Sequence, residues 1–177
     1  KSGERGIFNR QSAIQQAAKN GRRDTEHDFG CNPCSEIILR PYQFCNLSEV
    51  VIRENDTMDT LKEKVRLATI LGTFQATLTN FKYLRKVWKD NTEEERLLGV
   101  SLTGIMDNAM TSTNGEKLPI LLGVLKDEAI RTNAAIAKQL GISQSTAVTC
   151  VKPSGTVSQL TDAASGIHAR HNPYYIR

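Results

Sequence analysis

The stretch TAVTCVKPSGTVSQL, residues 146–160, carries the clearest fold signal in the chain. Its first part, Thr146 to Val151, is a run of β-branched and apolar residues that predicts a buried strand. The small residues Pro153-Ser154-Gly155-Thr156 predict a loop, and Val157 to Leu160 predict the start of a helix. A strand that leads through a short loop into a helix is typical of parallel α/β sheets.

The same alternation of strand and helix extends over the rest of the chain. Helices are predicted at 9–20, from the Asp56-Thr57 cap to about Trp88, and at 118–140, and strands at 37–39, 50–52 and 97–102. Apolar residues recur at helical steps in the long helix and predict one buried face: Leu61, Val65, Ala68, Leu71, Phe74 and Leu78. Thr92-Glu93-Glu94-Glu95 fits a capping box that opens a further short helix. We therefore expect an α/β fold with parallel strands.

The composition is that of an ordinary globular protein. Of the 177 residues, 39% are hydrophobic and 24% are charged, with 23 Lys and Arg against 19 Asp and Glu. A net charge of +4 with 6% aromatic residues argues against direct nucleic-acid binding. No run of roughly 18 apolar residues occurs, so we expect no membrane span. The chain starts at Lys1 without Met or a signal-peptide core, so we expect part of a longer cytoplasmic protein with reduced cysteines.

The densest chemical feature is the segment CNPCSE, residues 31–36, which is followed by Cys45. Three interpretations compete for it. Zinc could take the two cysteines of CNPC with His168 and His171, but about 130 residues separate the pairs, unlike a zinc finger or ribbon. A thioredoxin-like dithiol should open a helix, whereas residues 37–39 resemble a strand.

The third interpretation is radical chemistry on a nucleotide. In an extended segment, Asn32, Cys34 and Glu36 would lie on one face, because alternate residues of a strand point the same way. A thiyl radical on Cys34 could remove hydrogen from carbon while Glu36 takes a proton from a neighbouring hydroxyl. Asn32 could hydrogen-bond the same diol, and Cys45 would be a separate reductant.

Several segments resemble one enzyme family. Residues 30–37 with Cys45-Asn46-Leu47 resemble the active-site finger loop of ribonucleotide reductases. The eleven-residue step from Cys34 to Cys45 is similar to the adenosylcobalamin-dependent (class II) branch, and within it to the monomeric triphosphate reductases. Further segments resemble the same family in the same order: GERGIFNR at 3–10, GVSLTGIMD at 99–107, KPSGTV at 152–157, and finally GIH at 166–168 with residues 171–177.

The resemblance implies a fold and an activity. Residues 1–177 would form a single partial domain, namely the finger loop and much of the second half of a ten-stranded α/β barrel. The complete enzyme would reduce ribonucleoside triphosphates to 2′-deoxyribonucleoside triphosphates for DNA synthesis, with adenosylcobalamin as cofactor, a thioredoxin-like reductant and no catalytic metal site. The chain alone would be inactive without the missing N-terminal half of the barrel. A class II diphosphate reductase and a non-catalytic zinc or nucleotide-binding module stay open as alternatives.

The resemblance also implies a role for each site residue. Cys34 matches the cysteine that becomes the thiyl radical and removes the 3′ hydrogen of the ribose. Glu36 matches the base for the 3′ hydroxyl, and Asn32 matches the amide that orients the substrate hydroxyls. Cys45 matches one member of the dithiol that reduces the 2′ position.

Residues Pro153, Ser154, Gly155 and Thr156 match the substrate phosphate loop of the family. Elementary chemistry agrees, because a small-residue loop that opens a helix presents backbone N–H groups and hydroxyls to an anion. The alternative is that these residues only cap a helix.

Overall fold

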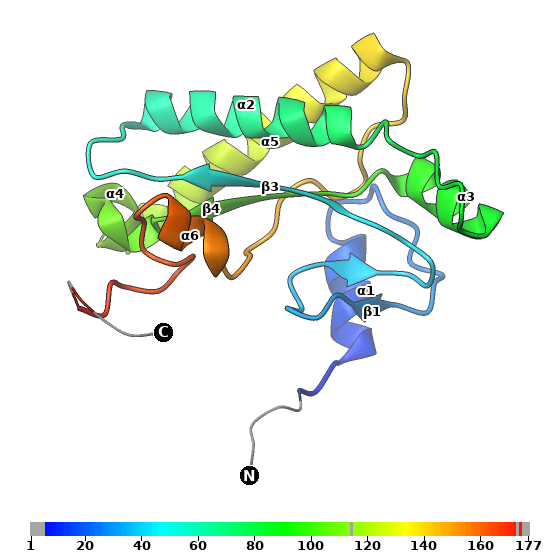
Figure 1. Cartoon of the computed structure of the whole chain (residues 1–177), viewed down its shortest axis with the longest axis horizontal. Helices are drawn as coiled ribbons and strands as arrows, with labels where there is room; N and C mark the ends of the chain where they lie inside the picture. The colour runs from blue at the N-terminus through cyan, green and yellow to red at the C-terminus, as the bar shows by residue number, and fades with distance from the viewer. Residues whose placement is uncertain (1–5, 114, 173, 175–177) are drawn as a thin grey trace.

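The computed structural model describes residues 6–113, 115–172 and 174 (Figure 1). The helices are α1 (Arg10–Ala18), α2 (Met58–Gln75), α3 (Lys86–Glu95), α4 (Ala109–Ser112), α5 (Leu118–Leu140) and α6 (Thr156–Leu160), with a 3-10 turn η1 (Ile105–Asp107). The strands are β1 (Gly30–Cys31), β2 (Ile38–Leu39), β3 (Asn46–Val51) and β4 (Leu98–Thr103). The ends of the quoted motifs, at residues 3–5, 173 and 175–177, lie outside the described residues.

The central sheet is parallel, as the alternation of elements predicts. β3 and β4 pair in register from Asn46 opposite Leu98 to Val51 opposite Thr103. Residues 147–150 run along the other edge of β4, where the Leu98 N–H donates to the Ala147 carbonyl at 3.0 Å. The predicted strand at 146–151 is thus extended but forms only one bridge, between Val100 and Thr149. Its Cys150 N–H donates to the Val100 carbonyl of β4 at 3.1 Å, and the chain then continues into the loop that contains Pro153.

The two faces of the sheet are covered by different elements. Val50, Leu98 and Val100 alternate with their neighbours and pack on α2 and α5 in the main hydrophobic core. Figure 1 shows α2 and α5 on one side of β3 and β4, and the β1–β2 hairpin with α1 on the other. Within the described ranges, none of the helices is both long and apolar enough to cross a membrane.

The predicted buried face of α2 is confirmed only in its first half. Leu61, Val65 and Ala68 are buried, but Leu71, Phe74 and Leu78 are 68%, 50% and 71% exposed. The inner face continues instead through small residues, Thr69, Gly72 and Thr73. The buried Asn133 of α5 donates to Thr73 Oγ1 at 3.0 Å, so a polar contact decides which side of α2 faces inward. The larger side chains therefore point outward.

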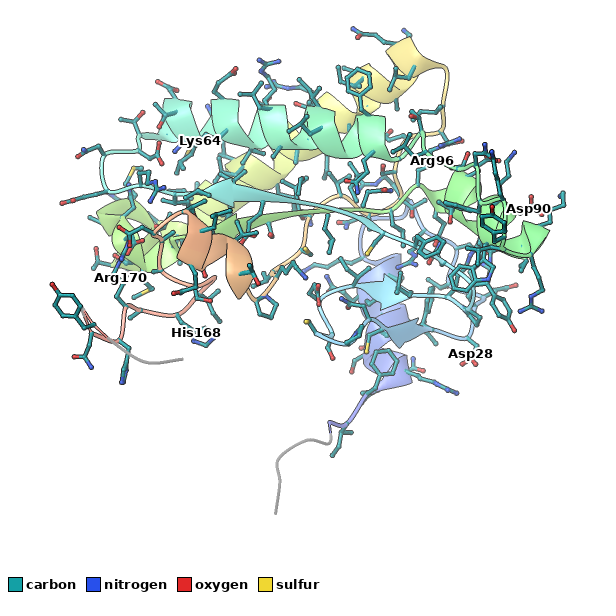
Figure 2. All side chains as sticks on the ribbon, viewed as in Figure 1. Asp28, Lys64, Asp90, Arg96, His168 and Arg170 are labelled. Atoms are coloured by element: carbon teal, nitrogen blue, oxygen red, sulfur yellow. The ribbon has the colours of Figure 1, made fainter. Side chains whose placement is uncertain are left out.

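The helix predicted to reach Trp88 is in fact two helices. α2 ends at Gln75, and α3 starts at Lys86. The connection contains Thr77, Thr79 and Asn80, whose side chains compete with helical hydrogen bonds. Figure 2 shows Arg96 between the ends of α2 and α3, where its guanidinium donates to the Ala76 carbonyl at 2.6 Å.

The capping box predicted at residues 92–95 is wrong. These residues form the last turn of α3, and Arg96 ends the helix in the left-handed conformation with φ of 43°. The reason is a tertiary contact, because the buried Glu95 carboxylate accepts hydrogen bonds from Arg23 at 2.7 and 2.9 Å. Arg23 also donates to the Ile38 carbonyl of β2 at 2.8 Å. This ion pair therefore ties the base of the hairpin to α3.

Gly99 allows the hairpin to approach the sheet. A Cβ atom there would lie 2.5 Å from Leu47 Cδ2, 3.0 Å from Cys150 Sγ and 3.0 Å from Ile37 Cδ1. No side chain fits in that space. The glycine thus sets the distance between β4 and the residue that follows Glu36.

The buried pair of Arg23 and Glu95 should matter for stability. We expect Glu95→Ala to lower the free energy of unfolding by about 3–5 kcal/mol, because it leaves the guanidinium buried without its counter-charge. Urea denaturation measures the change. Glu63→Ala, which removes an exposed pair with Arg66 on α2, is the control and should leave the midpoint unchanged. Equal effects of the two variants would contradict this role for the buried pair.

Substitution of alanine for two different glycines should change the stability of the fold in different directions. Gly99→Ala should cost about 1–3 kcal/mol by overpacking against Leu47 of β3, Cys150 and Ile37 of the hairpin. Gly72→Ala should be neutral or stabilise by up to about 1 kcal/mol, because it lies inside α2 and its Cβ would meet atoms no closer than 3.5 Å. Thermal unfolding of both variants checks the pair, and a Gly99→Ala protein as stable as the wild type would contradict the close packing around Gly99.

Candidate functional site

The CNPCSE segment forms the turn of an antiparallel hairpin. β1 and β2 pair through Gly30 with Leu39 and Cys31 with Ile38. The turn is closed by the Ser35 N–H, which donates to the Asn32 carbonyl at 2.9 Å. The side chain of Asn32 also takes part, because its Oδ1 accepts a hydrogen bond from the Ile37 N–H at 3.0 Å.

The extended geometry predicted for residues 32–36 is therefore wrong. Pro33 fixes its own φ, Asn32 closes the turn on itself, and Ser35 takes a φ of 63°. Alternation of a strand does not bring Asn32 and Glu36 together. The turn does so instead, and hydrogen bonding from the Asn32 side chain is one of the causes that lower the pKa of Glu36.

Cys34 lies at the tip of the turn and is exposed. The strand β2 follows the motif where a thioredoxin-like dithiol would have a helix. Cys31 lies in β1 and its thiol donates to Ser35 Oγ at 3.6 Å. All four cysteines are free thiols. Among the described residues, no three His, Cys, Asp or Glu side chains gather as a metal site would require.

Glu36 is the most deeply buried group of the turn. Its side chain is 1% exposed, and Oε1 accepts a hydrogen bond from Lys152 Nζ at 3.0 Å. The other oxygen, Oε2, is buried and has no hydrogen-bond partner among the described residues. Burial raises the pKa of Glu36, but hydrogen bonds from Lys152, the backbone and Asn32 outweigh it, so the pKa lies below 4.5. The ion pair thus stabilises the fold at pH above 4.5, and this contribution is lost as the pH falls through the lowered pKa.

Two thiols lie close enough to Glu36 to respond to its charge. Cys45, just before β3, is half-buried, and its pKa is raised first by burial and then by the Glu36 carboxylate. Burial and the same carboxylate raise the pKa of Cys150 to about 12. Both thiols therefore stay protonated at neutral pH. The structure brings together Glu36, Lys152, Cys45 and Cys150.

A cleft of about 640 Å³ opens beside this cluster. Its polar side contains Ser35, Glu36 and Cys150, and its apolar side comes mainly from β4 and α5. The lining includes Val100, Leu102, Leu118, Leu122 and Leu125. Glu36 lines this cleft, and its Oε2 is a buried acceptor without a hydrogen-bond partner among the described residues.

In the loop predicted to bind phosphate, Ser154 differs from the expectation because its hydroxyl is buried. Ser154 is 2% exposed, and its hydroxyl accepts from the Ser158 N–H at 3.1 Å, so it serves the fold internally. Thr156 is exposed and begins α6 one residue earlier than predicted. Gly166, with φ of 55°, packs on the loop so closely that a Cβ would lie 3.1 Å from the Lys152 carbonyl.

Lys152 is the site residue that sequence reasoning assigned no role. It appears in the quoted KPSGTV motif, but nothing in the local pattern indicates that its side chain reaches back to residue 36. The only available signal is a lone cation between an apolar strand and a loop of small residues. A contact over 116 positions of sequence depends on the tertiary fold.

Comparison with known proteins gives a consistent result. The adenosylcobalamin-dependent ribonucleoside-triphosphate reductase of Lactobacillus acidophilus is 31% identical over 173 residues, a match that covers 84% of this chain and 23% of that protein. The enzyme of the same name from Euglena gracilis is 29% identical, covering 97% of this chain and 23% of its own length. No protein-family model matches the chain.

A solved structure agrees in fold. The crystal structure of a B12-dependent (class II) ribonucleotide reductase superposes with a TM-score of 0.64 at 24% identity, covering 78% of this chain and 22% of that one. The predicted α/β class is thereby confirmed. This chain, which spans 23% of the length of the curated relatives, is a homologue of a segment of the adenosylcobalamin-dependent ribonucleoside-triphosphate reductases.

Proposed function

We propose that this chain is part of the catalytic barrel of a class II ribonucleotide reductase, an oxidoreductase that converts ribonucleoside triphosphates to 2′-deoxyribonucleoside triphosphates. Residues 1–177 would form one partial domain in the second half of the barrel. The N-terminal half, in the same chain or a split partner, completes the site. The free thiols suit a reducing cytoplasm.

One observation carries the proposal. Glu36 is a buried carboxylate with one oxygen held by Lys152 and the other without a partner, next to two protonated thiols. Such an oxygen is stabilised by a ligand that donates a hydrogen bond to it. A ribose hydroxyl is a donor of this kind, and a carboxylate base is what its deprotonation needs.

The proposed chemistry uses three side chains of the hairpin. Cys34, as a thiyl radical, takes the 3′ hydrogen atom and later returns one to the same carbon. Glu36 takes the proton of the 3′ hydroxyl, which favours loss of the 2′ hydroxyl as water once that group is protonated. Asn32 orients the hydroxyls through the amide N–H that its hydrogen bond to Glu36 leaves, since Oδ1 is already used by the Ile37 N–H.

Cys45 supplies reducing power. Together with a second thiol from the N-terminal half of the barrel, it gives two electrons and two protons to the substrate and becomes a disulfide. The balance is ribonucleotide plus dithiol to deoxyribonucleotide plus disulfide plus water. A thioredoxin-like reductant then restores the dithiol. The raised pKa of Cys45 fits this role, because a protonated thiol has a hydrogen to give.

The chemistry of adenosylcobalamin requires an accessible thiol, and Cys34 fits this requirement. When bound, this cofactor supplies the organic radical that side chains alone cannot form. Cys34 is exposed at the tip of the turn, so its S–H is accessible from outside the segment. Cys34 is thus the residue of this chain that would face the cofactor, and the remainder of the enzyme would hold it.

The loop at Pro153, Ser154, Gly155 and Thr156 is proposed to bind the substrate phosphates. Thr156 is exposed and offers a hydroxyl donor. Lys152 ends beside Glu36, so the same short segment can place a phosphate at one end and the ribose at the other. The buried Ser154 shapes this loop.

The experiment compares two cysteines of the hairpin in the full-length protein. Cys34→Ser should reduce deoxyribonucleotide formation by at least a thousandfold, because an alcohol O–H bond is too strong to replace the thiol in radical chemistry. Cys31→Ser, which keeps a donor toward Ser35, should retain activity within about threefold. Turnover is measured with a ribonucleoside triphosphate, adenosylcobalamin and a dithiol.

Three results would contradict the proposal. Turnover by Cys34→Ser would exclude the assigned radical position. Turnover without adenosylcobalamin would exclude the class. A well-folded wild-type protein that binds nucleotide but shows no turnover would favour a binding module.

A further inference from the structure

This inference rests on the proposed function and concerns a residue to which the proposed chemistry assigns no step. Lys152 lies between the strand-like residues 147–150 and the loop at 153–156. Its ammonium group reaches the hairpin and donates to Glu36 Oε1 at 3.0 Å. It therefore forms a direct polar link between the start of the loop and the turn that carries Cys34.

The contact differs from an ordinary surface ion pair. The Glu36 side chain is 1% exposed and that of Lys152 is 27% exposed. An exposed pair contributes little, but a buried carboxylate without a counter-charge becomes protonated or leaves its site. With Oε1 occupied by Lys152, the carboxylate cannot rotate freely, and Oε2 is the oxygen left for a ligand.

We propose that Lys152 is a positioning residue that holds Glu36 by Oε1, so that Oε2 is presented to the substrate hydroxyl in its ionised, proton-accepting form. Lys152 itself touches no reacting atom. Because it directly precedes Pro153, it also fixes the spacing between the loop and the base.

The other groups that face Glu36 do not replace this lysine. The thiols of Cys45 and Cys150 are protonated and carry no charge. Three other cations share a cleft with Glu36, namely Lys126 of α5, Arg22 and Arg23. Among the described residues, Lys152 is the cation in ion-pair contact with Glu36.

Removal of Lys152 should change how activity depends on pH. In Lys152→Gln, burial still raises the pKa of Glu36 while its main opposing partner is gone. The acid limb of kcat/KM should move to higher pH, and kcat at pH 7 should fall about ten- to a hundredfold. KM should change little, because the loop at 153–156 is intact. Lys152→Arg, which keeps a cationic donor, should restore the acid limb.

A matched control is available on the other side of the sheet. Lys64 of α2, labelled in Figure 2, pairs with the buried carboxylate of Asp56 at 2.5 Å. Lys64→Gln removes the same type of ion pair, with a partner 7% exposed, away from the hairpin. It should lower the thermal midpoint without moving the acid limb. A general loss of stability is thereby separated from an effect on Glu36.

A second measurement does not depend on turnover. The Glu36 carboxylate of full-length protein labelled with carbon-13 glutamate is titrated by NMR, and Glu36→Gln identifies its signal. The titration should move to higher pH in Lys152→Gln and stay in place in Lys64→Gln.

The outcomes separate this inference from the proposed function. A Lys152→Gln enzyme with an unchanged acid limb, an unchanged titration and normal kcat would overturn the inference while the proposed function stands. A wild-type protein with no adenosylcobalamin-dependent turnover, but with a Glu36 titration that depends on Lys152, would overturn the function and support the placement of Glu36.

Discussion

A carboxylate that is removed from water needs a cation beside it, and this constraint fixes the hairpin at both ends. At the base, Glu95 of α3 holds Arg23, which in turn holds the Ile38 carbonyl of β2. At the turn, Lys152 holds Glu36. The hairpin has only two residues in each strand, so its own ladder cannot set its position. The two ion pairs and the close contact at Gly99 do so.

The same constraint connects stability with chemistry. A fully satisfied buried carboxylate would be a structural group, as Glu95 is. Glu36 is only half satisfied, because Oε2 is buried without a partner among the described residues. The nearby thiols keep their protons because the negative charge of Glu36 and their burial oppose thiolate formation. In this state an ionised carboxylate can accept a proton, while neutral thiols still carry hydrogen that they can donate.

The elements that depend on local sequence were predictable. The strand β4 and the helix α5 lie where the apolar residues at 97–102 and 118–140 predict them. Features that depend on distant partners were not. The role of Glu95 and the outward position of Leu71 depend on contacts of Arg23 and Asn133, which periodicity does not contain.

The candidate site divides in the same way. Residue types and spacing left three interpretations of the CNPCSE segment open. The family resemblance, which curated relatives confirm, selected Cys34, Glu36 and Cys45 as candidate site residues. Strand alternation nevertheless gave the wrong geometry for residues 32–36, since Asn32 and Pro33 favour a turn. Lys152 could be found only from the fold, because its partner lies 116 positions away.

The most direct test is the structure of the full-length protein with a ribonucleoside triphosphate bound. The account predicts that the 3′ hydroxyl of the ribose lies about 2.6–3.2 Å from Glu36 Oε2, while Lys152 keeps its contact with Oε1 and Cys34 Sγ faces the ribose. A nucleotide bound away from the hairpin, with Oε2 of Glu36 still unpartnered, would contradict the account.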